Sequence, residues 1–283
     1  MSTIKTFILK HSVLTYFALA LAISWGGLLL VTSGPGGIPG RSEETESLLP
    51  LGYLTMLAGP FVAGILMTVL ISGRAGFREL LSRLLKWRVG AVWYAVALLA
   101  APLLAMVTLL ALLPASPVFL PGIFATDDKA SMLLTGLIVG LIVGIFEEVG
   151  WTGFAIPRLR QHHSILITGL MVGVVWGVWH LALFLWLSGD SSGSLSLPHF
   201  LPSVLFCLGI LPVFRVLMVW VYDRTESLLV AILMHASITG GVALILMPLT
   251  ILGVPNIIWY LVLAAALWII VAVVQRRKSL HRG

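Results

Sequence analysis

The longest uncharged stretch of this sequence, residues 227–275, contains no Asp, Glu, Lys or Arg. A helix needs roughly 20 apolar residues to cross a bilayer, so this stretch is long enough for two membrane spans. Pro248, Gly253 and Pro255 mark a turn between them. Soluble domains carry about 25% charged residues, whereas this chain carries 10%. The sequence therefore predicts an all-α, multi-pass membrane protein.

Eight apolar segments, each long enough to span a bilayer, follow one another along the chain. They cover residues 12–32, 51–72, 91–113, 132–156, 164–187, 199–221, 227–248 and 256–274. This pattern predicts a bundle of about eight transmembrane helices, forming a single integral membrane domain over residues 1–283. Residues 73–88 are predicted to form a short amphipathic helix at the interface, because Leu and Phe recur at helical spacing among basic residues.

The positive charges are distributed unevenly between the two sides of this arrangement. Fourteen of the 17 Lys and Arg residues fall on one side, and Arg215 falls within the sixth span. The opposite side holds only Arg41 and Lys129 together with six acidic residues. Loops rich in Lys and Arg stay in the cytoplasm, so both chain termini are predicted to be cytoplasmic, with the protein in the cell membrane. The net charge of +6 then reflects topology and contact with membrane lipid, and no nucleic-acid partner is expected.

Few ionisable side chains remain inside the spans. Glu147 and Glu148 lie in the fourth span, His180 in the fifth and His235 in the seventh. A charged side chain near the bilayer centre costs about 2.5–3.5 kcal/mol on insertion scales, so such a group indicates function. An ion pair with Arg158 at the membrane surface is a weaker explanation, since about ten residues, or ~15 Å of helix, lie between. Each histidine alone is more simply structural, but the four groups together predict one polar chamber.

Two chemistries fit these four groups. A carboxylate beside a histidine can deprotonate a water held between them, as a general base does. Alternatively, Glu147, His180 and His235 are plausible zinc ligands that leave one position for water. Neighbouring helical residues point about 100° apart, so one glutamate is expected to act directly. The other is expected to orient it, to hold a backbone group or to stay protonated. The metal-free pair is the favoured interpretation, with no cofactor required and zinc as the alternative.

Three short motifs resemble those of the CPBP intramembrane proteases, the CAAX prenyl endopeptidase and bacteriocin-processing family, also called the Abi family. The first family motif is EExxxR, and residues 147–154 read EEVGWTGF. The second places an aromatic residue shortly before a histidine, and residues 176–180 read WGVWH. The third is HxxxN or HxxxD, and residues 235–239 read HASIT. The motifs occur in the family's order on three separate spans, within a core of about residues 132–248.

The resemblance implies a role for each matching residue. Glu147 and His180 would activate the attacking water, in the manner of a metalloprotease-like hydrolase. His235 would stabilise the oxyanion, and Thr239, at the Asn or Asp position of the third motif, would assist through its hydroxyl group. With Glu148, these residues form the candidate catalytic set.

Two positions depart from the family pattern. Thr152 occupies the place of the motif Arg, and Thr239 that of the motif Asn or Asp. Without that Arg, a planar cation with five donors, Glu148 is expected to lack a cationic partner and to be neutral. These two departures leave the predicted fold unchanged and put catalytic activity in question.

The leading hypothesis is an intramembrane endopeptidase that hydrolyses a peptide bond with activated water. By resemblance, its substrates would be membrane-associated polypeptides, such as prenylated CAAX-type termini or bacteriocin leader peptides. The alternative is a non-catalytic relative that acts as a membrane scaffold or bacteriocin-immunity protein. A transporter with Glu147 or Glu148 as a proton relay is a third reading, but it predicts an internal symmetry that the sequence lacks.

Overall fold

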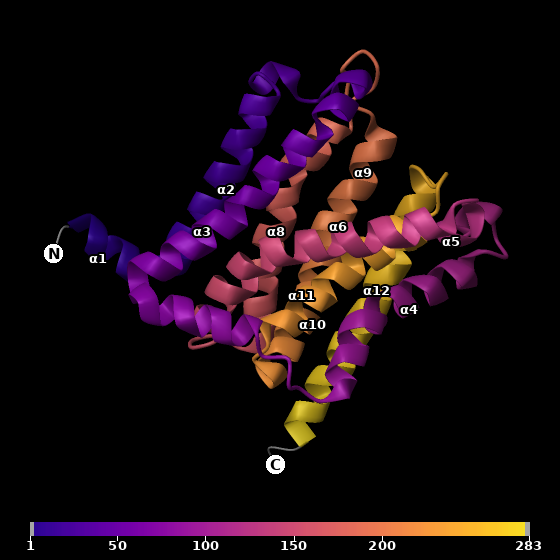
Figure 1. Ribbon diagram of the computed structural model, residues 1–283. Helices are drawn as coiled ribbons and strands as arrows, with labels where there is room; N and C mark the ends of the chain where they lie inside the picture. Colours follow the sequence, from indigo (N-terminus) through magenta and orange to yellow (C-terminus); the bar gives the residue numbers. More distant parts are fainter. Residues whose placement is uncertain (1–2, 281–283) are drawn as a thin grey trace.

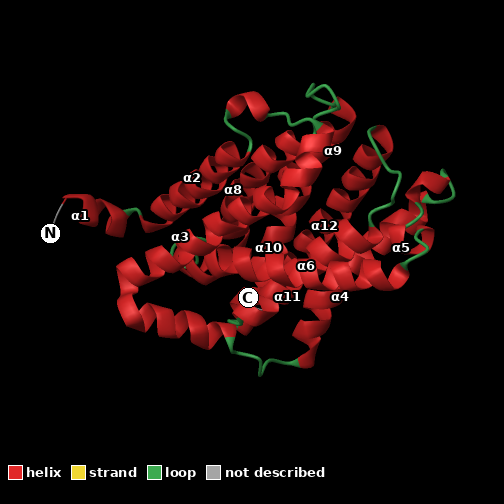
Figure 2. Ribbon diagram, turned by 45° about the horizontal axis from the view of Figure 1, so that its top comes forward, coloured by secondary structure: helices red, strands yellow, loops and turns green. Residues whose placement is uncertain are grey.

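The computed structural model describes residues 3–280, and this part of the chain is helical with no β-strand (Figures 1 and 2). Eight of its helical segments are long and apolar enough to cross a bilayer. They run Ser12–Val31, Glu43–Leu84, Ala91–Leu112, Lys129–Leu159, Ile165–Leu187, Leu197–Thr225, Leu228–Leu246 and Val254–Arg276. The eight predicted spans are therefore confirmed. That the termini lie in the cytoplasm stays a prediction.

The elements are mostly long α-helices joined by short turns. The main helices are α2 (Ser12–Val31), α3 (Ser42–Leu84), α4 (Ala91–Leu112), α6 (Lys129–Gly150), α8 (Ile165–Leu187), α10 (Leu211–Thr225), α11 (Leu228–Ala236) and α12 (Val254–Leu280). The shorter ones are α1 (Thr3–Lys10), α5 (Gly122–Ala125), α7 (Ile156–Leu159) and α9 (Leu197–Leu205), with 3₁₀ turns η1 (Pro35–Gly37) and η2 (Pro117–Phe119). Three π-helical segments complete the set: η3 (Trp151–Ala155), η4 (Phe206–Ile210) and η5 (Ser237–Leu246).

Helix α3 is bent at Gly73, whose φ of 55° and ψ of −146° are non-helical. This positive φ favours glycine, because a Cβ atom there would be strained. The arm of α3 beyond the bend runs along the rim of the bundle (Figure 2). It contains the predicted amphipathic segment, which is helical as expected but ends at Leu84 and continues the second span.

Helix α6 runs across the bundle and packs against α3 and α11 (Figure 1). Two of its glycines make the contact with α11 possible. A Cβ atom on Gly144 would lie 2.8 Å from the carbonyl oxygen of Ile232, and one on Gly140 would lie 2.8 Å from that of Ala236. Small residues let membrane helices approach this closely. The approach brings the end of α6 beside His235.

The π-helical segments change which residues share a helix face. Segment η5 begins two residues after His235. A π-helix has i→i+5 hydrogen bonds and a wider turn than an α-helix, so residues four apart no longer stack as they do in an α-helix. π-Helical turns occur frequently at functional sites, and here η3 and η5 both adjoin the candidate residues.

Candidate active site

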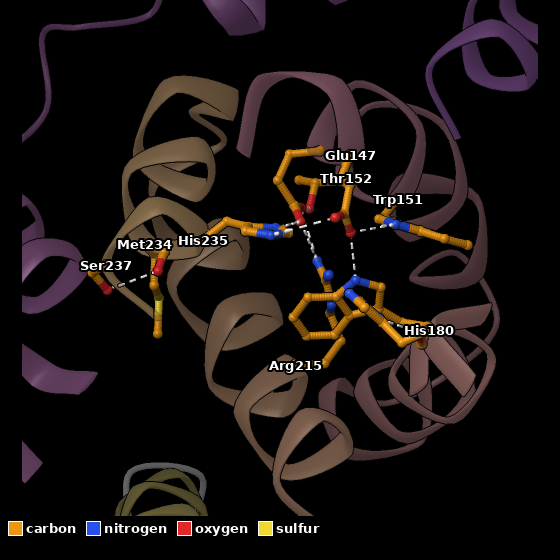
Figure 3. A network of polar contacts seen from close by, with 10 residues as sticks. Glu147, Trp151, Thr152, His180, Arg215, Met234, His235 and Ser237 are labelled. Carbon is orange, nitrogen blue, oxygen red and sulfur yellow. Dashed lines mark hydrogen bonds and ion pairs between the residues drawn. The ribbon is translucent and has the colours of Figure 1, made fainter. Parts of the chain in front are cut away.

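Two buried carboxylates lie near the end of α6. Glu147 is 1% exposed and Glu148 is fully buried. Figure 3 shows the polar network around them, to which α6, η3, α8, α10 and α11 contribute side chains. Because a buried charge is costly unless it is paired and hydrogen-bonded, the partners of each carboxylate decide what it can do.

Glu148 is held by three side chains. Nη1 of Arg215 lies 2.8 Å from each of its two oxygens. Nδ1 of His235 lies 2.7 Å from Oε1, and the hydroxyl of Thr152 donates to Oε2. The carboxylate is thus surrounded by donors, one of them a full positive charge, and is fixed in position.

Arg215 is itself fully buried on α10. Its guanidinium carbon lies 4.0 Å from the centroid of the Trp176 ring, so a cation–π contact adds to the ion pair with Glu148. The expectation that Glu148 lacks a cationic partner was therefore wrong. In the first motif, the arginine stands four residues after the second glutamate. Here the guanidinium comes from Arg215 on a different helix, and Thr152 at the motif position donates its hydroxyl to the same carboxylate.

Glu147 divides its two oxygens between different partners. Oε2 accepts hydrogen bonds from the indole nitrogens of Trp176, at 2.5 Å, and of Trp151, at 3.3 Å. Oε1 lies 3.9 Å from Nε2 of His235. One oxygen is therefore anchored by two indoles, and the other is directed toward the imidazole.

The two ring nitrogens of His235 face different glutamates. A carboxylate can only accept from Nδ1, so the 2.7 Å contact with Glu148 assigns a proton to that nitrogen. Nε2 points toward Glu147 (Figure 3). The imidazole thus lies between the two carboxylates, with Nδ1 toward Glu148 and Nε2 toward Glu147. That only one glutamate acts directly stays a prediction.

His180 lies at the edge of this network, on α8. Its Nδ1 is 2.9 Å from the carbonyl oxygen of Trp176, which can only accept, so Nδ1 carries the proton and Nε2 has the free lone pair. The ring packs edge-on against Trp176 and Trp179, with centroids 5.6 and 4.5 Å away. His180 is half-buried, in contrast to the two glutamates and His235. Trp176 connects it to Glu147.

Thr239 is half-buried in η5, and within residues 3–280 its side chain makes no hydrogen bond to the glutamates or histidines. The third motif assumes that the residue four positions after His235 shares its face. The π-helical geometry of η5 removes that stacking. The role of Thr239 in oxyanion binding stays a prediction.

The alternative zinc site would need three ligands converging on one point. Among residues 3–280, no group of three or more His, Cys, Asp or Glu side chains has the geometry to hold a metal ion. Glu147 directs one oxygen to two indole donors. The metal-free reaction and the zinc alternative both stay predictions.

Comparison with known families identifies the segment that carries this site. Residues 129–241 match the family model described as type II CAAX prenyl endopeptidase Rce1-like. The match runs from the start of α6 into η5, so it includes all five candidate catalytic residues and Arg215. A search of curated proteins finds no match.

Proposed function

From the premise that residues 129–241 form an Rce1-like domain in a multi-pass membrane protein, we propose that the chain is an intramembrane endopeptidase. Its substrates are membrane-associated polypeptides, of the prenylated CAAX or leader-peptide kind, and it acts in the cell membrane. The single observation that supports this most is the geometry of Glu147. One of its oxygens is anchored by two indoles, and the other lies 3.9 Å from an imidazole nitrogen in a buried site.

In the proposed reaction, Glu147 and His180 bind and deprotonate one water. Among residues 3–280, no hydrogen-bond donor contacts Oε1 of Glu147 or Nε2 of His180, so both atoms can accept from a water. The water oxygen attacks the carbonyl carbon of the scissile bond, and its proton passes to this pair. Breaking the C–N bond returns a proton to the leaving amine, so the products are a carboxylate and an amine.

His235 is proposed to stabilise the oxyanion. To donate from Nε2 it has to be an imidazolium, since Nδ1 already donates to Glu148. The cluster then contains two carboxylates, one guanidinium and one imidazolium, and its formal charges cancel. A preorganised donor of this kind is typically worth 10²–10³ in rate. No cofactor takes part in these steps.

The test is cleavage by purified protein in liposomes, comparing the wild type with Glu147→Gln. The substrates are prenylated CAAX peptides and short membrane-anchored leader peptides. The variant is expected to lose 10²–10⁴ in kcat, the usual contribution of a general base. Glu226→Gln is the matched control, because Glu226 is exposed and, among the described residues, its salt bridge is with Lys86. Equal cleavage by the wild type and Glu147→Gln would refute the proposal.

Two further experiments test the alternatives, a zinc-dependent reaction and a non-catalytic scaffold or immunity protein. A zinc chelator is expected to leave cleavage unchanged, and loss of activity that zinc restores would contradict the metal-free reaction. The scaffold or immunity reading is favoured by Thr152 and Thr239 and predicts no cleavage of any peptide. It also predicts that cells carrying Glu147→Gln keep the wild-type phenotype and do not show the defect that deletion of the protein produces.

A further inference from the structure

A cavity lies apart from the candidate active site, at the end of the bundle where several spans begin or end. Its volume is about 750 Å³. It is lined by the junction of α1 and α2, by α3 on both sides of its bend, and by the turn that follows α7. Figure 1 shows the α1–α2 junction and the bend of α3 close together at one end of the molecule. The first candidate span begins at Ser12 and the fourth ends at Leu159, so the cavity lies at one end of the spans, where a membrane surface is expected.

The charges lining this cavity are mostly positive. Lys10, Arg83 and Arg158 contribute cations, and the imidazoles of His11, His162 and His163 are added to them. Glu79 is the one acidic residue of the lining, among the residues that the structure describes. Its side chain is 68% exposed and its oxygen is 3.7 Å from Nε of Arg83. A single exposed carboxylate does not balance three cations.

Both guanidinium groups are also held by neutral partners, in addition to the Arg83–Glu79 contact. Arg158 donates to the carbonyl oxygen of Phe154 at 3.0 Å and lies 3.8 Å from the centroid of its ring. Arg83 donates to the hydroxyl of Tyr222 at 2.9 Å and to the carbonyl of Gly153 at 3.1 Å. Nε of Arg83 is buried and makes no hydrogen bond. These cations are preorganised, and no carboxylate neutralises them at hydrogen-bonding distance.

The rest of the lining is aliphatic, with Leu9, Val13, Leu14 and Ile71 among its members. Aliphatic side chains add nothing to the binding of a small inorganic anion, whereas a lipid has apolar groups directly beside its phosphate that can pack against them. Anionic headgroups at a membrane surface attract basic side chains with about 1 kcal/mol for each Lys or Arg. We propose that this cavity is a binding site for the phosphate headgroup of an anionic phospholipid, with Arg83, Arg158 and Lys10 as its cationic contacts.

The proposal is tested by lipid binding and does not depend on proteolysis. Purified protein in neutral detergent is titrated with phosphatidylglycerol or phosphatidylcholine, and bound lipid is counted by native mass spectrometry. The wild type is expected to bind one phosphatidylglycerol roughly tenfold or more tightly than phosphatidylcholine, with Arg158→Gln and Lys10→Gln each reducing that preference about fivefold. Arg78→Gln is the matched control, because Arg78 is an exposed cation on the same arm of α3 that does not line the cavity.

The outcomes separate the possible occupants. Equal binding of the two lipids, or equal losses in Arg78→Gln and Arg158→Gln, would overturn the proposal. A parallel titration with inorganic phosphate tests for a free anion: competition by phosphate with no preference between the lipids assigns the site to the free ion and also overturns the proposal. Lys10→Gln guards against misfolding of the Arg158 variant, since Lys10 is exposed, and an unchanged melting temperature validates both variants.

Discussion

Nη1 of Arg215 on α10 lies 2.8 Å from both carboxylate oxygens of Glu148 on α6, and neither side chain is exposed. Removing one partner of a buried ion pair costs about 3–5 kcal/mol, because the other charge is left without compensation. Arg215→Gln is therefore expected to lower the free energy of unfolding by that amount. The loss is detected as a lower melting temperature of the purified protein in detergent. Arg224→Gln, an exposed position on the same helix, is expected to change it by less than about 0.5 kcal/mol.

A second substitution tests whether the guanidinium that pairs with Glu148 can be supplied from position 152 as well as from position 215. Thr152 already donates to Glu148, so Arg at this position has the same carboxylate within reach. We expect Thr152→Arg to restore part of the melting temperature and of the cleavage lost in Arg215→Gln, while lowering stability in the wild-type background by crowding. If Thr152→Arg has the same effect in both backgrounds, the two positions are not coupled.

The two neighbouring glutamates are expected to respond differently to the same substitution. Glu148→Gln leaves Arg215 buried without a counter-charge and should cost about 3–5 kcal/mol of stability. Glu147→Gln retains an oxygen that accepts from Trp176 and Trp151, so its melting temperature should stay near that of the wild type. Thermal unfolding of the two variants side by side is the measurement. Equal melting temperatures would contradict this separation of a positioning role from a reactive one.

Trp176→Phe removes the indole nitrogen that donates to Glu147 at 2.5 Å and keeps an aromatic face beside Arg215. A hydrogen bond to a charged group is worth about 1.5–3 kcal/mol, so kcat is expected to fall roughly 10- to 150-fold. Trp268→Phe is the control, because Trp268 is 42% exposed on α12. A lower melting temperature with unchanged kcat would instead assign Trp176 a packing role only.

Gly144→Ala tests the close contact of α6 with α11. The added Cβ atom would lie 2.8 Å from the backbone oxygen of Ile232, which cannot rotate away, so the helices have to separate. Overpacking of this kind costs about 1–3 kcal/mol, and the Glu148–His235 contact should lengthen with it. We expect a lower melting temperature and slower cleavage. Gly26→Ala on α2 has no atom within 4 Å of the new Cβ and should be neutral in both measurements.

Much of the fold follows from the sequence because charge is so costly in a bilayer. The eight spans, and the four ionisable groups Glu147, Glu148, His180 and His235, are predictable from the positions where charge is present or absent. The bend at Gly73 and the π-helical segments are not, since they depend on backbone angles that hydropathy does not report.

Arg215 shows why the site itself was only partly predictable. It is the one arginine in the apolar part of the sixth span, and that isolation was the available signal. Its partner is 67 residues away, on a helix whose direction across the bundle cannot be read from spacing. The motif comparison directed attention to the residue four positions after Glu148. In the folded chain, the donors of that carboxylate come from three different segments: η3, α10 and α11.

The burial of Glu147, at 1% exposed, has a consequence for timing. A peptide and its water reach this carboxylate only when side chains or helices around it move aside. Such openings take microseconds to milliseconds, and in many enzymes they limit turnover. In the proposed enzyme, the rate of hydrolysis would be limited by how often the bundle opens to let substrate reach Glu147. A membrane polypeptide that dissociates before the bundle opens would not be cleaved, whatever its sequence. Residence time at the bundle would then matter for selection as much as the residues flanking the cut.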